Sequence, residues 1–126
     1  MATVELTHET FINAITDNDI VLVDFWAPWC GPCRQFAPVF ESMSESHPDV
    51  VFAKVNTEDQ QPLAAQFQIR SIPTLMVFSD RIIVFSHPGA LPPARLETVI
   101  EKVAALDMEE VRKQIAEQAD KEEGTA

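Results

Sequence analysis

The segment from Ile20 to Trp26 constrains the fold of this 126-residue chain more than any other, because Asp24 is its only polar residue. A strand with one face in water alternates polar and apolar side chains, whereas a continuous apolar run is typical of a strand covered on both faces. We therefore expect Ile20–Trp26 to be a central strand of a sheet, with helices packed on each side of it.

The segments around this strand predict the helices and the other strands. Thr7 is a suitable N-cap, and Phe11, Ile12 and Ile15 follow it at helical spacing. Further apolar patterns predict strands at 3–6, 50–55, 74–78 and 82–85, and helices near 33–43, 59–67 and 93–103. This alternation predicts an α/β fold with a central mixed β-sheet flanked by helices on both faces.

The formal net charge of the chain is −11. An acidic surface repels phosphate backbones and anionic lipids, so we expect no nucleic-acid partner and no membrane partner. The first ten residues lack the apolar core of a signal peptide, and no apolar run approaches the ~20 residues that span a bilayer. These features favour a cytoplasmic protein.

The chain has two cysteines, Cys30 and Cys33, which are three residues apart. Structural disulfides normally join distant segments, so this pair is a poor candidate for one. A zinc site needs four ligands, and the histidines His8, His47 and His87 are scattered, so we expect no metal. A C-x-x-C pair in a chain without a secretion signal favours redox chemistry over two buried cysteines that are close by chance.

The position of the pair between a strand and a helix favours ionisation of its first thiol. A strand that ends at Trp26 and a helix that begins near Cys33 place Cys30 at a helix N-terminus. The free N–H groups and the helix dipole lower the pKa of a thiol there, and the thiolate is the nucleophile. We expect the Cys30 sulfur to be exposed, with Cys33 lying deeper and able to attack a mixed disulfide.

The motif that carries the pair is Trp29-Cys30-Gly31-Pro32-Cys33, which resembles the active-site motif of the thioredoxin family. Flanking segments of the family follow in the same order: Asp24-Phe25-Trp26-Ala27, Ala37-Pro38 and Ile72-Pro73-Thr74. The resemblance implies the thioredoxin fold, with residues 1–106 as the thioredoxin domain and 107–126 as an acidic extension. It also implies a protein-disulfide reductase, in which Cys30 attacks the target disulfide and Cys33 resolves the mixed disulfide.

Asp24 and Lys54 are the candidates for controlling protons at the cysteine pair. A carboxylate between apolar neighbours should be desolvated, which raises its pKa. By the resemblance, Asp24 lies under the cysteines and accepts the Cys33 proton as a general base, and Lys54 on the neighbouring strand moderates its charge. The alternatives are a strand-end aspartate that points to water and an ordinary surface lysine.

The resemblance also implies a shallow apolar patch that binds substrate beside the cysteines. Ile72-Pro73 corresponds to the family's cis-proline bond, which leaves the Ile72 backbone free to pair with an extended substrate. The alternative is a trans proline that opens the next strand. The residues implied in substrate binding are Trp29, Gly31, Pro32, Ile72, Pro73 and Gly89.

Two positions depart from the family in ways that affect the backbone. The turn at Ser79-Asp80-Arg81 contains no glycine, so we expect a longer or bulged connection. Gln68 stands where a glycine is frequent, which predicts a positive φ at a residue with a side chain.

The extension after Leu106 is predicted to be partly helical. Asp107 and Glu110 resemble a capping pair, and Met108, Val111 and Ile115 form a thin apolar stripe. Whether the preceding helix continues through Asp107 or a new one starts there is left open by the sequence.

The function that these features favour is a monomeric general reductase of disulfide-containing proteins. No bound cofactor is expected, because a thioredoxin reductase would supply electrons from NADPH to the Cys30–Cys33 disulfide. Two other functions remain open: a binding module whose extension docks a partner, and a reductase dedicated to one enzyme.

Overall fold

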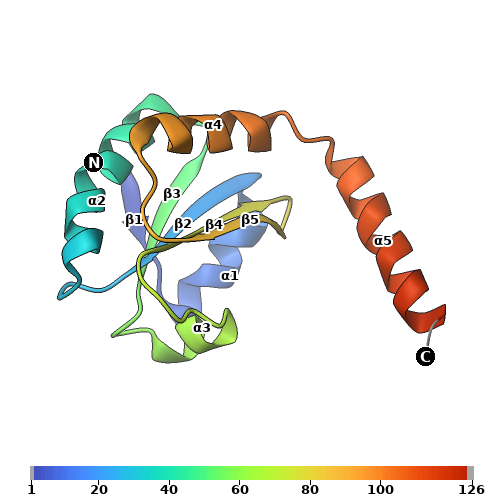
Figure 1. The fold of residues 1–126 in the computed structure, drawn as a ribbon, viewed down its shortest axis with the longest axis horizontal. Coiled ribbons are helices and arrows are strands. Elements are labelled where there is room, and N and C mark those ends of the chain that lie inside the picture. The colour runs from blue at the N-terminus through green and yellow to red at the C-terminus, as the bar shows by residue number, and fades with distance from the viewer. Residues whose placement is uncertain (1, 125–126) are drawn as a thin grey trace.

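The computed structural model describes residues 2–124 and has a five-stranded mixed sheet between two layers of helices (Figure 1). The strands are β1 (Thr3–Glu5), β2 (Ile20–Trp26), β3 (Val51–Asn56), β4 (Thr74–Ser79) and β5 (Ile82–Pro88). The helices are α1 (His8–Asp17), α2 (Gly31–Ser46), α3 (Gln61–Gln66), α4 (Pro93–Ala104) and α5 (Met108–Gly124). The predicted α/β fold is confirmed.

The apolar strand β2 lies at the centre of the sheet, as its composition predicts. The strand order is β1-β3-β2-β4-β5; β3 is parallel to both β1 and β2, β4 runs antiparallel to β2, and β5 runs antiparallel to β4. Asp24 on β2 is in register with Lys54 on β3 and with Leu75 on β4. Asp24 therefore lies on the central strand between β3 and β4, each of which has a further strand on its outer side.

Two hydrophobic cores hold the helices on the sheet. Phe11 of α1 and Leu63 of α3 pack on one face, against the side chains of Val21, Val23 and Phe25. The other face is covered by α2 and α4, whose core residues are Phe36, Phe40, Leu96, Ile100 and Val103. Because successive residues of a strand point to opposite faces, the continuous apolar run of β2 supplies both cores.

Helix α1 begins as the sequence predicts, but one of its apolar residues faces solvent. The Thr7 side chain accepts from the Thr10 N–H, and the Thr10 side chain accepts from the Thr7 N–H, which completes a capping box. Phe11 and Ile15 are buried, whereas Ile12 is 64% exposed. Ile12 follows Phe11 directly and so points about 100° away from it around the helix.

The connection between β4 and β5 differs from the expected longer or bulged loop. Ser79 pairs with Ile82, so the connection has two residues, and both have positive φ: 53° at Asp80 and 70° at Arg81. This is the backbone of a type I′ turn, whose twist matches that of a hairpin. The expectation was wrong because a non-glycine pair adopts the turn; the irregularity in the ladder lies further along, between Val77 and Phe78.

The positive φ predicted for Gln68 is confirmed, at 55°. Gln68 follows α3, where its N–H donates to the carbonyl of Ala65 at 3.0 Å. A left-handed residue at this place ends a helix, which is the reason that glycine is common there.

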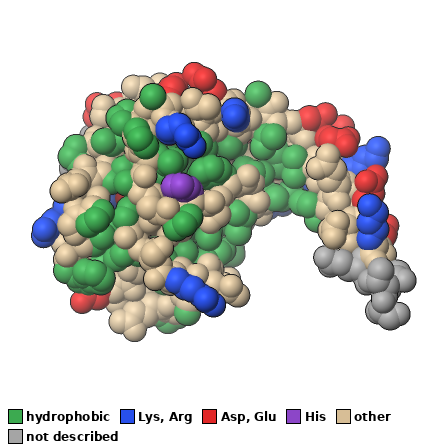
Figure 2. Space-filling model, in the orientation of Figure 1, with side chains coloured by type: hydrophobic (Ala, Val, Ile, Leu, Met, Phe, Trp, Pro, Cys, Tyr) green, Lys and Arg blue, Asp and Glu red, His purple; other side chains and the backbone are tan. Residues whose placement is uncertain are grey.

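Helix α4 does not continue through Asp107, and a new helix, α5, starts after that residue. α4 ends at Ala104, and the Asp107 carboxylate accepts from the N–H groups of Glu109 and Glu110 at 3.1 and 3.3 Å, which caps α5. α5 extends away from the sheet and its helices, with acidic and basic side chains along it (Figures 1 and 2). None of the helices described in residues 2–124 is long and apolar enough to cross a membrane.

Candidate active site

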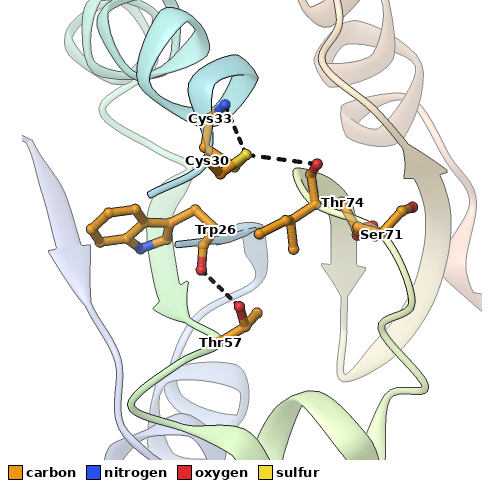
Figure 3. The surroundings of a disulfide bond; sticks show 7 residues. Trp26, Cys30, Cys33, Thr57, Ser71 and Thr74 are labelled. Carbon is orange, nitrogen blue, oxygen red and sulfur yellow. Dashed lines mark hydrogen bonds between the residues drawn. A yellow bond between two sulfur atoms is a disulfide. The ribbon is translucent and has the colours of Figure 1, made fainter. Parts of the chain in front are cut away.

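Cys30 is the N-cap residue of α2, which is the position that the sequence predicts. Its Sγ accepts a hydrogen bond from the Cys33 backbone N–H at 3.2 Å (Figure 3). Its carbonyl oxygen accepts from the Arg34 N–H at 3.1 Å and so starts the helix. Pro32 lies in the first turn, where a missing N–H costs nothing because such groups have no partner within the helix. The sulfur is therefore at the positive end of the helix dipole.

Cys30 and Cys33 form a disulfide, and Cys30 is more buried than the sequence led us to expect. Their Cα atoms are 5.2 Å apart. Cys30 is 5% exposed and Cys33 2% exposed, so the expectation of an exposed first sulfur is wrong for the disulfide form. The pair packs with Ala27, and Trp26 and Ile72 lie against this cluster. Trp29, the residue before the pair, is 66% exposed.

The loop before β4 lies directly against the disulfide. The Ile72–Pro73 peptide bond is cis, as expected, and the Ile72 carbonyl oxygen is 3.8 Å from the Cys30 Sγ. The Thr74 hydroxyl donates to the Ser71 carbonyl at 2.6 Å, which closes the loop on itself (Figure 3). The loop and the sulfur therefore form one continuous surface.

Gly89 is joined to this loop by its backbone. Its N–H donates to the Pro73 carbonyl at 2.7 Å, and its φ is +101°. A side chain is strained at this φ, so the close approach of the two loops depends on glycine at this position. Pro32 lines a neighbouring hollow of about 320 Å³ together with Ala90 and Leu91. A larger cavity of about 670 Å³, between β5 and α4, contains none of the predicted site residues.

Thr57 fixes the end of β2 from which the cysteine loop departs. Its backbone N–H and its hydroxyl both donate to the Trp26 carbonyl, at 2.8 and 3.0 Å (Figure 3). We did not predict the role of Thr57, because it acts on a carbonyl 31 residues away that only the folded chain brings near. The sequence shows Thr74 only as part of a family segment, and indicates no role for it or for Ser71. The residue types of these positions carry no signal for the role.

Asp24 is fully buried on the central strand β2, which excludes the reading in which it points to water. Its exposure is 0%, and both carboxylate oxygens lack a hydrogen-bond partner among the described residues. Burial raises the pKa of Asp24 to about 7; Lys54 opposes this rise and Glu5 adds to it. The desolvation expected from its apolar neighbours is confirmed. A carboxyl with this pKa can both accept and return a proton near neutral pH.

Lys54 lies beside Asp24 on the neighbouring strand and is half-buried. The two residues are in register, and the Lys54 Nζ lies 4.4 Å from the centre of the Trp26 ring. A cation over an aromatic face is attracted by the ring. Lys54 therefore packs on Trp26, which itself lies against the cysteine cluster.

The site is that of a thiol–disulfide oxidoreductase. It has a redox-active cysteine pair at a helix N-terminus, a cis-proline loop against this pair, and a buried carboxyl on the central strand. The family model for thioredoxin matches residues 2–102. The putative thioredoxin 2 of Streptomyces coelicolor is 57% identical over 117 residues, which cover 93% of this chain and 87% of the relative. The chain belongs to the thioredoxin family.

Other relatives and a solved structure agree with this family. Thioredoxin 1 of Synechococcus elongatus is 46% identical over 99 residues, which cover 77% of this chain and 92% of the relative. A mutant thioredoxin from Halobacterium salinarum NRC-1 is similar in structure, with a TM-score of 0.77 and 34% identity; the match covers 83% of this chain and 93% of that one. The chain is thus an enzyme of dithiol/disulfide exchange, and its redox group is its own cysteine pair.

Proposed function

We propose that this protein is a general reductase of protein disulfides in which Cys30 is the attacking thiolate. The observation that carries the proposal is the hydrogen bond from the Cys33 N–H to the Cys30 Sγ at the N-terminus of α2. The same N–H and the helix dipole would stabilise a negative charge on this sulfur once the disulfide is reduced. The uncharged Gly31 and Pro32 between the cysteines add no further stabilisation of the thiolate, which favours a reductant.

The reaction proceeds by two exchanges of sulfur bonds. The Cys30 thiolate attacks one sulfur of the target disulfide, so that a Cys30–target bond forms and the target's own bond breaks, with the second target sulfur leaving as a thiolate. Cys33 then attacks the Cys30 Sγ, which forms the Cys30–Cys33 disulfide and releases the first target sulfur. Two electrons pass to the target, and two protons complete its thiols.

Asp24 acts in the second exchange as the general base for Cys33. A thiol must lose its proton to become the nucleophile, and the carboxylate of Asp24 is the acceptor that we assign to it. We infer that a water carries the proton between them. Lys54 limits the rise of the Asp24 pKa and so keeps part of the carboxyl ionised near pH 7.

The substrate lies on the surface formed by the cis-proline loop and the cysteine loop. An extended target segment pairs with the backbone of Ile72, next to the Cys30 Sγ. Trp29 offers an exposed aromatic side chain, and Gly31 leaves open space for the target backbone, while the buried Pro73 supports the Ile72 loop. Pro32 and Gly89 bound the same surface on the side of α2 and of the loop after β5.

The chain acts as a monomer in the cytoplasm and is recharged by a thioredoxin reductase, which takes its electrons from NADPH. We divide it into a thioredoxin domain, residues 1–106, and an extension, residues 107–126. The extension docks a partner through the stripe of Met108, Val111 and Ile115, the last of which is 49% exposed. Helix α2, whose N-cap is Cys30, lies on the opposite side of the molecule from α5 (Figure 1). We therefore infer that the extension takes no part in the chemistry.

Reduction of insulin disulfides, driven by NADPH and a thioredoxin reductase, tests the proposal. The wild type should turn over, Cys30→Ser should lose activity and form no covalent adduct, and Cys33→Ser should accumulate a mixed disulfide on Cys30. The two serine variants are matched controls for each other, because each removes one sulfur. Full activity of Cys30→Ser, or an adduct on Cys33 alone, would show that the roles are assigned wrongly.

A further inference from the structure

We propose that Glu5 is a second carboxylate of the active site, which shares Lys54 with Asp24 and so biases the proton equilibrium of Asp24. Glu5 does not touch the cysteines and acts as a positioning residue. The inference rests on the proposed role of Asp24 as the base for Cys33. It adds a residue that the motif around the cysteines does not contain.

The register of three strands places the two carboxylates on either side of one lysine. Glu5 of β1 is opposite Lys54 of β3, and Lys54 is opposite Asp24 of β2. Residues in register across adjacent strands point to the same face of a sheet, and adjacent strands are about 4.8 Å apart. Glu5 and Asp24 therefore flank Lys54 at one strand's distance each. Strand β3 lies between β1 and β2 (Figure 1).

Lys54 is not committed to either carboxylate. Among the side chains that the structure describes, those of residues 2–121, no ion pair within 4.0 Å involves Lys54, whose ammonium lies over the Trp26 ring instead. The Asp24 oxygens have no hydrogen-bond partner there, and neither has the buried Trp26 Nε1. An ammonium in this position can move toward one carboxylate only by moving away from the other.

The charges around Glu5 and Asp24 couple the two groups. Asp24 faces Lys54 and Glu5, while Glu5 faces Lys54, Asp59 and the Trp26 indole, whose contact with Glu5 falls short of hydrogen-bond geometry. Desolvation raises the pKa of Glu5, against the opposing charge of Lys54. Two carboxylates that compete for one ammonium cannot ionise independently, so a negative charge on Glu5 makes it harder for Asp24 to lose its proton.

The consequence for the reaction is a base that can work in both directions. A strongly ionised Asp24 would take the Cys33 proton readily but return it poorly, whereas a group that titrates near the working pH does both. The charge of Glu5, on the exposed edge strand β1, contributes to this balance from outside the core. A residue at the surface thus adjusts a group that is fully buried.

Carbon-13 NMR titration of the Asp24 carboxyl in the oxidised full-length chain tests the inference without turnover. Glu5→Gln should move the Asp24 midpoint to lower pH by roughly half a unit, since a charge two strands away is removed and Lys54 is released. Glu45→Gln, on the exposed side of α2 and distant from the site in sequence, is the matched control and should leave the midpoint unchanged. An unchanged midpoint in Glu5→Gln would overturn the inference.

A second measurement separates sharing of Lys54 from simple repulsion. Lys54→Gln should raise the Asp24 midpoint, and Glu5→Gln should then shift it less than it does when the lysine is present. Equal shifts in the two backgrounds would show that Glu5 acts without Lys54 and would contradict the sharing. Circular dichroism of each variant shows whether its fold is retained.

The pH profile of insulin reduction distinguishes this inference from the proposed function. The acidic limb of the pH profile measured for Glu5→Gln should move by the same amount as the Asp24 midpoint in the NMR titration. If the NMR midpoint moves and the profile does not, Glu5 tunes Asp24 as inferred, but Asp24 is not the base. If neither moves, the inference about Glu5 is wrong, whatever Asp24 does.

Discussion

An ionisable side chain is buried near the cysteine end of the sheet, which is the end where β2 leads into the cysteine loop, whereas such side chains are exposed along helix α5. At the cysteine end, Asp24 is removed from water, and its pKa rises to about 7. Along α5, the charged side chains that the structure describes all remain exposed, as at Glu110 and Arg112. Burial gives a carboxyl a pKa that is useful in a reaction, whereas the charged side chains of an exposed helix stay in water and offer a surface to other molecules.

The largest expected effect is on the rate of insulin reduction, which should depend on Cys30 and not on the extension. Cys30→Ser should lower the rate of insulin reduction on the order of a thousand-fold, because a serine hydroxyl is a poor nucleophile and leaving group in this exchange. A chain that ends at residue 106 should keep the wild-type rate within a factor of about two. A large loss in the shortened chain, measured with the same insulin assay, would place part of the chemistry in the extension.

The next effect is on stability, when a large apolar side chain is replaced by alanine in the core and on α5. Phe40→Ala, in the core under α2, should cost about 3–5 kcal/mol of unfolding free energy, because Phe40 is fully buried. Ile115→Ala, on α5, should cost less than about 0.5 kcal/mol. Urea denaturation of both variants measures these values. A comparable loss at Ile115 would mean that its side chain is covered in solution.

The buried charge of Asp24 should also be visible in stability. Its pKa is raised in the fold, so below about pH 4 the group is neutral in both states, and stability is lost as the pH rises toward 7. Asp24→Asn lacks this loss, and its stability relative to the wild type should rise by roughly 3 kcal/mol between pH 5 and pH 8. Urea melts at the two pH values measure the change; a constant difference would argue that Asp24 is solvated.

The smallest expected effect concerns the contact between α5 and the β4–β5 turn. Arg112 of α5 pairs with Asp80 of the β4–β5 turn, and both side chains are about half exposed. Exposed ion pairs contribute about 0–1 kcal/mol and are screened by salt. Arg112→Ala should change the melting temperature by about a degree or less, with no change in insulin reduction. A loss of several degrees by differential scanning calorimetry would show a tighter attachment of α5.

The regular parts of the fold could be predicted because burial leaves a strong pattern in the sequence. The apolar run of Ile20–Trp26 gave both the bounds of β2 and its central position. Thr7 predicted the start of α1 through its hydroxyl. The turn at Asp80 and Arg81 could not be predicted in the same way, because side chains other than glycine seldom adopt a positive φ, and here the paired strands on either side impose it.

The site could be predicted where its residues are adjacent in the sequence or carry unusual chemistry. Cys30, Cys33 and Asp24 meet these conditions, since a carboxylate inside an apolar strand is conspicuous. Glu5 and Thr57 do not, because a glutamate near a terminus and a threonine after a strand are common. Their relation to the site depends on strand register and on a backbone carbonyl, which are properties of the folded chain.

Alkylation of the reduced full-length protein tests the central claim most directly, namely that the N-terminus of α2 makes Cys30 the nucleophile. The protein is treated with iodoacetamide between about pH 6 and pH 7, and the modified peptide is identified by mass spectrometry. We expect rapid modification of Cys30 while Cys33 stays unmodified, since a free cysteine, with a pKa of about 8.5, is mostly protonated in this range. Equally slow modification of both thiols, or faster modification of Cys33, would contradict it.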